Sequence, residues 1–231
     1  MAETIIGLCT SGTRLKVAVT AGGRIYQAQK KEYNQEKALF PLIKRELKKA
    51  GATLRSVNAV CAARGPGRFT GIRISLTLAG AMKALAGARV HTVTLFEILA
   101  LQAFDCAPYK TWAAKNPGGR IAALLHAFKD EYFCQFFRPS ARRPLPDGEP
   151  VWLKEGELKE LLAAAGVFYA AGDSEEHPGI YALLPPGTAA APGPVSKIIP
   201  GYIIKAALAY GSKTLKPLYL KPAKYELENK K

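Results

Sequence analysis

Three strand-like segments at the start of the chain constrain its fold more than any other feature. Residues 4–9 (TIIGLC) are an apolar run of strand length, and residues 14–19 (RLKVAV) alternate between polar and apolar side chains. A third segment of mixed pattern follows at residues 24–30. The turns between them are short and rich in Ser, Thr and Gly, which is typical of antiparallel neighbours. The chain is therefore predicted to open with a three-stranded antiparallel meander.

Helix and strand patterns alternate after this meander. Helical periodicity and buried-strand runs are predicted, in chain order, at residues 34–50, 57–62, 70–86, 89–93 and 94–104. Thr94 and Glu97 have the spacing of a capping box, which marks the start of the last of these helices. The order β-β-β-α-β-α-β-α is that of one ribonuclease H-like lobe, as found in the actin-like ATPase superfamily. We therefore predict an α/β fold of this type.

The second half of the sequence is less regular. Its predicted elements are a hairpin, a helix, a buried strand, a loop region and a last helix, at residues 120–138, 155–165, 167–170, 172–194 and 202–210. These elements predict a reduced second lobe. We expect an N-terminal lobe over residues 1–104 and a smaller C-terminal lobe over residues 105–231, with the last helix packing back on the first lobe.

The charge of the chain is its most unusual bulk property. Among 231 residues, 33 Lys and Arg stand against 18 Asp and Glu, a net charge of +15. A basic surface attracts polyanions, so tRNA, an acidic partner and a general habitat effect all stay open as explanations. No apolar run is long enough for a membrane helix and the first residues lack a secretory pattern, so a cytoplasmic protein without membrane contact is expected. The four cysteines and three histidines lack metal-ligand spacing, and no metal site is predicted.

A glycine-rich loop lies between the strand at residues 57–62 and the following helix. Gly65, Gly67 and Gly71 permit close backbone approach, and Thr70 stands where a helix N-cap is expected. Such a loop can bind an anion at the helix N-terminus, but glycines also serve strand-to-helix turns for steric reasons alone. Metal-assisted phosphoryl transfer needs carboxylates, and the first strand ends in Cys9 instead. The loop is therefore interpreted as mainly architectural, with anion contact as a second role.

The loop carries a resemblance to a known family. The run GPGRFTGIR is similar to the GPGSFTGLR signature of the YeaZ/TsaB family, the accessory subunit of the bacterial machinery that makes threonylcarbamoyladenosine in tRNA. Further similar segments are the opening strand with its Thr-Ser turn, VNAVCAA, TLFE, HAFKDEYFCQFF and PLYLKP. The motif residues, each a candidate for anion contact, are Gly65, Pro66, Gly67, Arg68, Phe69, Thr70, Gly71 and Arg73. Departures from the family are Cys9 for an Asp, Arg68 for a Ser, and a missing His at residues 33–35.

The resemblance implies a function and a set of partners. The chain would be a non-catalytic subunit, a pseudoenzyme without catalytic residues, that binds and supports a TsaD-type catalytic subunit. A TsaE-type ATPase would belong to the same complex, and tRNA would be reached through it. No cofactor is expected to bind tightly, and ATP or ADP only at the complex interface. Two alternatives stay open, a stand-alone actin-fold ATPase or small-molecule kinase, and an RNA-binding module.

The helix after the loop is apolar on two sides and is the candidate interface. Ile72, Leu76, Gly80 and Ala84 form one row at a spacing of four, and the small residues allow a partner helix to approach. Residues Ile74, Leu78, Ala81 and Leu85 form the second row. We predict that the first row, together with Leu39 and Ile43 of the preceding helix, contacts the catalytic subunit. The same face could pair two copies of the chain when it is alone.

Overall fold

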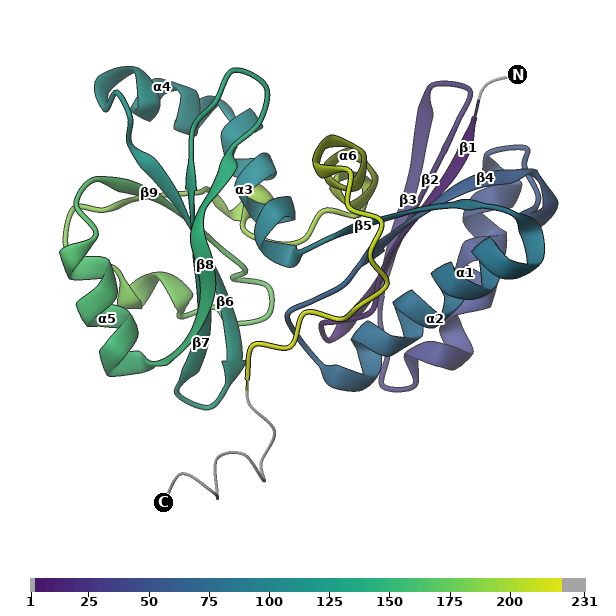
Figure 1. Ribbon diagram of the computed structural model, residues 1–231, viewed down its shortest axis with the longest axis horizontal. Coiled ribbons are helices and arrows are strands. Elements are labelled where there is room, and N and C mark those ends of the chain that lie inside the picture. Colours follow the sequence, from purple (N-terminus) through teal and green to yellow (C-terminus); the bar gives the residue numbers. More distant parts are fainter. Residues whose placement is uncertain (1–2, 222–231) are drawn as a thin grey trace.

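Two five-stranded sheets make up the computed structural model, which describes residues 3–221 (Figure 1). The first sheet contains β1 (Thr4–Cys9), β2 (Arg14–Ala21), β3 (Arg24–Lys31), β4 (Val57–Ala63) and β5 (Arg89–Val93). Its strand order is β3-β2-β1-β4-β5. The first three strands are antiparallel neighbours, and β4 and β5 run parallel to β1. The predicted antiparallel meander followed by parallel strands is confirmed.

The second sheet repeats the strand order of the first. It contains β6 (Arg120–Phe128), β7 (Glu131–Arg138), β8 (Leu145–Lys154), β9 (Phe168–Gly172) and β10 (Ala189–Ala190). The order is β10-β9-β6-β7-β8, with β6, β7 and β8 antiparallel and β9 parallel to β6. When the five strands of each sheet are numbered in chain order, both sheets have the spatial order third, second, first, fourth, fifth, read from one edge. The predicted actin-like, ribonuclease H-like fold with two lobes is confirmed.

The second lobe is the smaller repeat. Where the first lobe has the long helix α2 (Phe69–Ala86), the second has only the 3₁₀ helix η2 (Ile180–Leu183). Its fifth strand, β10, is two residues long. The predicted loop region at residues 172–194 therefore holds η2, β10 and the start of a further 3₁₀ helix, η3 (Gly193–Val195).

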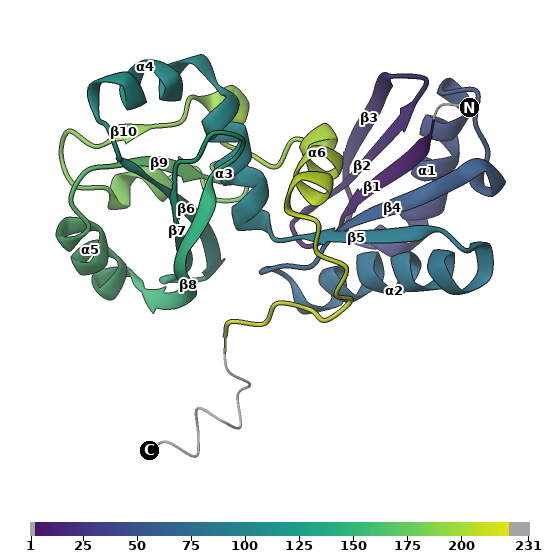
Figure 2. The same ribbon diagram turned by 45° about the horizontal axis from the view of Figure 1, so that its top comes forward.

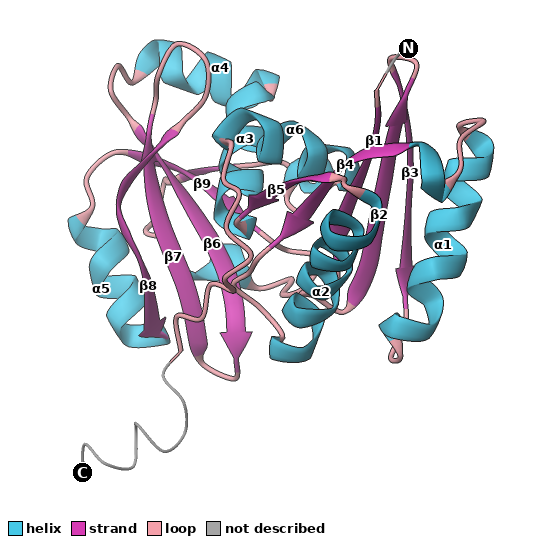
Figure 3. Ribbon diagram, turned by 45° about the vertical axis from the view of Figure 1, so that its right-hand side comes forward, coloured by secondary structure: helices cyan, strands magenta, loops and turns pink. Residues whose placement is uncertain are grey.

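Helices cover both faces of the first sheet. Helices α1 (Gln35–Lys49) and α2 pack on one face, where Leu39, Ile43 and Ile72 join the apolar side chains of the strands (Figure 3). Helix α6 (Pro200–Tyr210) packs on the opposite face, against β1, β2 and β4. Helix α6 lies between the two lobes (Figures 1 and 2).

The two lobes exchange their last helices. Helix α3 (Leu95–Asp105) follows the first sheet but packs against β6, β7 and β9 of the second sheet. Helix α6 follows the second sheet and packs on the first. The other face of the second sheet is covered by α5 (Glu155–Ala164), and the short helix α4 (Ala107–Lys115) follows α3. The boundary between the lobes at residues 104 and 105 stays a prediction.

The chain returns from α6 as a strap, residues 211–221, that runs from the first lobe to the second (Figure 2). The Thr92 amide of β5 donates to the Ser212 carbonyl at 2.7 Å, and the Leu218 amide donates to the Arg64 carbonyl at 2.7 Å. At the far end, the Lys221 ammonium pairs with Glu131 of β7. The strap thus ties β5 and the loop after β4 to the second sheet.

No helix within residues 3–221 is long and apolar enough to span a membrane. The predicted C-terminal similarity PLYLKP extends to Pro222, which lies outside the described residues.

Candidate functional site

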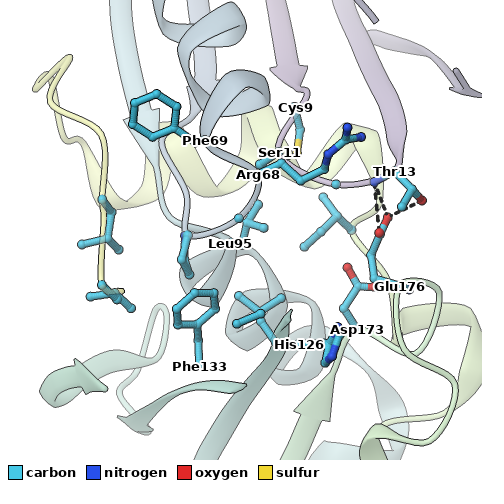
Figure 4. A pocket seen from close by; sticks show the side chains of 18 of the residues that line it. Cys9, Ser11, Thr13, Arg68, Phe69, Leu95, His126, Phe133, Asp173 and Glu176 are labelled. Atoms are coloured by element: carbon cyan, nitrogen blue, oxygen red, sulfur yellow. Dashed lines mark hydrogen bonds between the residues drawn. The ribbon is translucent and has the colours of Figure 1, made fainter. Parts of the chain in front are cut away.

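A cleft of about 940 Å³ lies between the two lobes (Figure 4). One wall comes from the first lobe: the turn after β1, the loop before α2 and the start of β2. The other wall comes from the β6–β7 hairpin and from the segment after β9, and the strap closes one side. Its lining residues include Cys9, Ser11, Thr13, Lys16, Gly67, Arg68, Phe69, Leu95, His126, Phe133, Asp173, Glu176, Leu218 and Tyr219.

The loop before α2 is locked against the turn after β1. The Arg68 amide donates to the Ser11 carbonyl at 2.8 Å, and the Thr10 hydroxyl bonds to the Gly71 carbonyl and to Ser75. A Cβ on Gly71 would overlap the Thr10 carbonyl oxygen. Glycine is needed there because the two backbones are in direct contact. This packing supports the architectural interpretation of the loop.

The start of α2 differs from the prediction. The helix begins at Phe69 with Arg68 in the N-cap position, and no side chain caps it. Thr70, the predicted N-cap, is exposed in the first turn, because the contact with Ser11 fixes the chain direction two residues earlier. The Arg68 side chain reaches along the cleft toward Thr13 (Figure 4). Anion contact by these residues stays a prediction.

Phe69 of α2 lines the cleft, and Arg73 lies four residues further along the same helix. The Phe69 ring stacks on Tyr219 of the strap, with a distance of 4.9 Å between centroids. The Arg73 guanidinium lies 4.4 Å from the centroid of the same ring. Phe69 therefore contacts the strap directly, and Arg73 packs on the Phe69 ring.

One end of the cleft is polar and holds a buried thiol and a buried carboxyl group. Cys9 ends β1, and its Sγ lies 3.2 Å from the Ser11 hydroxyl. Burial raises the pKa of the Cys9 thiol above its ordinary value. Asp173 follows β9 and is 2% exposed. Burial raises its pKa to about 6, although the nearby Lys16 ammonium acts in the opposite direction.

Acidic residues of the second lobe bond to the first lobe beside this polar end. The Glu176 carboxylate accepts hydrogen bonds from the Thr13 amide at 2.9 and 3.0 Å and from the Thr13 hydroxyl at 3.0 Å. Glu175 pairs with Lys16, whose side chain is 3% exposed, and with Arg14 at 3.4 Å. Burial alone would raise the pKa of Glu175, but the hydrogen bond from Lys16 and its charge lower it. These contacts hold the lobes together across the cleft.

The sequence prediction missed Asp173, Glu175 and Glu176. They lie in the region predicted as surface loops, far in sequence from Cys9 and Lys16. One local signal was available, since Asp173 directly follows a buried apolar strand, Phe168–Gly172. Carboxyl ends of parallel strands are the usual position of functional side chains in α/β sheets.

Two of the three histidines lie side by side. His126 and His177 stack with 4.4 Å between ring centroids, and the His126 Nε2 donates to the Lys129 carbonyl at 2.8 Å. Burial lowers the pKa of His177, and the charge of the neighbouring His126 lowers it further. Among residues 3–221, no group of three or more His, Cys, Asp or Glu side chains could hold a metal ion.

The predicted interface row requires a correction. Ile72 and Leu76 are buried under α2, and Leu39 and Ile43 are buried under α1, all in the core between these helices and the first sheet. They are unavailable to a partner. Gly80 is half-buried, with Leu215 of the strap 3.6 Å from the position of a Cβ. Ala84 alone of that row is exposed.

The second row of α2 lies nearer the surface. Leu85 is 89% exposed, and Ile74, Leu78 and Ala81 are half-buried. Both rows are equally apolar in sequence, so their periodicity could not show which one packs on the sheet. Ile72 and Leu76 pack with the strands of the first sheet, and Leu215 of the strap lies beside Gly80.

The chain is similar to known proteins over a region that contains the loop motif. A family model described as TsaD, tRNA N6-adenosine threonylcarbamoyltransferase, matches residues 27–138. A relative from Buchnera aphidicola, named tRNA threonylcarbamoyladenosine biosynthesis protein TsaB, is 34% identical over 107 residues, which cover 45% of this chain and 50% of the relative. A Haemophilus influenzae protein of the same name is 29% identical over 146 residues, covering 60% of this chain and 56% of that protein. The chain spans about half the length of the curated relatives it matches.

Solved structures agree on the fold. YeaZ from Pseudomonas aeruginosa superposes with a TM-score of 0.71 at 21% identity, covering 94% of this chain and 100% of that chain. A second structure, described as an uncharacterized protein from the same organism with similarity to peptidase YEAZ, gives 0.72 at 23% identity, with 95% and 100% covered. The predicted resemblance to the YeaZ/TsaB family is confirmed by these comparisons together.

Proposed function

We propose, from the premise that this chain resembles the YeaZ/TsaB family, that it takes part in the biosynthesis of threonylcarbamoyladenosine in tRNA. The similarity to the two proteins named TsaB carries this proposal. Within that process we propose the role of a non-catalytic subunit that binds a TsaD-type catalytic subunit and supports it.

The chemistry of the cleft supports a non-catalytic role. Phosphoryl transfer in an actin-like cleft needs carboxylates that hold Mg²⁺. Here β1 ends in the Cys9 thiol, whose raised pKa keeps it protonated and makes it a poor ligand for a hard cation. The carboxyl group of Asp173 is buried beside the Lys16 ammonium. Glu175 and Glu176 are already used in bonds between the lobes.

The outer surface of α1 and α2 is the proposed contact with the catalytic subunit. Leu85 is 89% exposed and continues the half-buried row of Ile74 and Leu78. On α1, Phe40 is 47% exposed. Exposed apolar side chains on neighbouring helices are typical of a protein–protein contact. Ala84 is the one residue of the predicted row that remains part of this surface.

The remaining partners follow from the proposed complex. A TsaE-type ATPase would join the same assembly, and tRNA would be bound through it. ATP or ADP would bind only where the subunits meet. Such a complex would work in the cytoplasm, and the chain alone could pair with itself through the same apolar surface.

Co-purification with a TsaD-type subunit and a tRNA-modification assay test the proposal. Leu85→Asp should weaken assembly at least about thirtyfold, because a charge replaces an apolar contact at the interface. Val167→Asp is the matched control, since Val167 is 61% exposed after α5 in the second lobe. The control should assemble and support modification as the unchanged chain does.

Three results would contradict the proposal. The first is normal assembly of Leu85→Asp, which would place the interface elsewhere. The second is robust magnesium-dependent hydrolysis of ATP by the purified chain, which would favour a stand-alone ATPase. The third is tight tRNA binding by the chain alone at physiological salt, because non-specific attraction weakens steeply as salt increases.

A further inference from the structure

Positive charge is concentrated in one part of the chain. Between Arg24 and Arg55 there are nine Lys or Arg and three Asp or Glu residues, a net charge of +6 in 32 residues. The remaining 199 residues carry the other +9 of the total of +15. The density of net charge is therefore about four times higher in this segment. The segment forms β3, α1 and the turn before β4.

All nine cations of this segment are exposed. They are Arg24, Lys30, Lys31, Lys37, Lys44, Arg45, Lys48, Lys49 and Arg55. Lys37, Lys44 and Lys48 recur along α1 at spacings of seven and four, so they point to the same side of the helix, which we call the basic face. That side is opposite the buried row of Leu39, Leu42 and Ile43.

The acids of the segment neutralise little of the basic face. Glu46 is buried under α1, where it accepts from Arg45 Nε at 2.9 Å and from Lys49 Nζ at 3.0 Å. Glu32 pairs with Lys30 at 2.8 Å. Within residues 3–221, Lys37, Lys44 and Lys48 have no ion pair. Lys37, Lys44 and Lys48 therefore present unpaired charge within the described residues, and Glu36 is the exposed acid of the same helix.

The helix that carries the basic face shares a core with α2. Helices α1 and α2 cover the same face of the first sheet and share one core. Phe40 is 47% exposed between Lys37 and Lys44 along α1, and Leu85 is 89% exposed on α2. Protein interfaces combine an apolar centre with a polar, charged rim. A phosphate backbone alone would leave both apolar side chains uncovered, so the observations favour a protein over RNA.

We infer that the protein docking on α1 and α2 carries an acidic surface opposite Lys37, Lys44 and Lys48. This inference rests on the proposed function and specifies the chemistry of its partner. Complementary charge accelerates association and sets the orientation of two subunits, while contributing less to the lifetime of the complex. The basic face would thus act on the rate of assembly, and the apolar row of α2 on its stability.

A charge reversal on α1 tests the inference. The variant Lys44→Glu/Lys48→Glu is compared with Lys110→Glu/Lys115→Glu, which makes the same change of net charge on exposed positions of α4. Association and dissociation rates with a TsaD-type subunit are measured at low and physiological salt. The α1 variant should associate about tenfold more slowly at low salt, with a weaker salt dependence and a nearly unchanged dissociation rate. The α4 variant should resemble the unchanged chain.

The outcomes separate the two proposals. Equal rates in the two charge-reversal variants would overturn the inference, because net charge rather than the basic face would then control association. A loss of tRNA affinity specific to the α1 variant, with normal subunit association, would also overturn it and assign the face to RNA. If these variants behave alike while Leu85→Asp abolishes assembly, only the inference fails. If the unchanged chain does not bind the catalytic subunit, the proposed function fails and the inference falls with it.

Discussion

At the scale of single residues, the carboxyl group of Asp173 is a buried acid of the cleft with a raised pKa. Burial raises its pKa to about 6, well above the ordinary value of 3.8. Between these two pH values the folded chain holds a proton that the unfolded chain has lost. Stability from this group is therefore present at low pH and decreases as pH rises from about 4 to about 6.

Asp173→Asn should remove this pH dependence. The amide cannot ionise, so the stability of the variant relative to the unchanged chain should increase by up to about 3 kcal/mol between pH 4 and pH 7. Urea unfolding at several pH values measures the difference. A difference that stays constant over this range would show that Asp173 titrates normally in the folded protein.

The sequence allowed the glycines of the loop to be predicted, but not the buried acid Asp173. The glycines of the 65–71 loop were recognised because their need for close approach is local, and Gly71 does contact Thr10 directly. Asp173 acquires its raised pKa from burial in the folded protein, and the nearby Lys16 is more than 150 positions away in the chain. No pattern within a short window contains that information.

At the scale of elements, prediction succeeded where burial is regular. The strands and helices of the first lobe have periodic apolar residues and were found. Strand β8 was missed, because its sequence LPDGEPVWLK contains two prolines, a glycine and two acids at an exposed edge. The buried side of α2 was chosen wrongly for another reason. Both sides of that helix carry apolar residues, and the row of Ile72 and Leu76 is buried by tertiary packing on the first sheet.

The ring stack of Tyr219 on Phe69 is one of the contacts that hold the strap. Tyr219→Ala removes the stack on Phe69, worth about 1 kcal/mol. The Leu218 amide, bonded to Arg64, should then exchange its hydrogen about five times faster, with little change in Tm. Tyr33→Ala is the control, because Tyr33 is 87% exposed. Equal exchange in both variants would mean that the backbone bonds alone hold the strap.

At the scale of the whole molecule, the two lobes are similar units that exchange helices. The first lobe could be predicted from its element order alone, and the second lobe repeats its strand order. The exchange of α3 and α6 could not be predicted in the same way, because both helices are apolar on most sides. Such helices need two apolar neighbours, and the space between the lobes provides them. The relative position of the lobes is then fixed by polar contacts at the edge of the cleft.

The pair of Glu175 and Lys16 should dominate these polar contacts. Lys16 is buried, so Glu175→Gln would leave its ammonium without a full counter-charge inside the protein, which costs about 3 kcal/mol or more. Glu176→Gln affects bonds to exposed Thr13 and should cost about 1 kcal/mol or less. The double variant Lys16→Met/Glu175→Gln should recover most of the loss, because it removes both charges. Thermal unfolding measures all three. If Asp173 takes over the pairing with Lys16, Glu175→Gln will cost no more than Glu176→Gln, and the double variant will show no recovery.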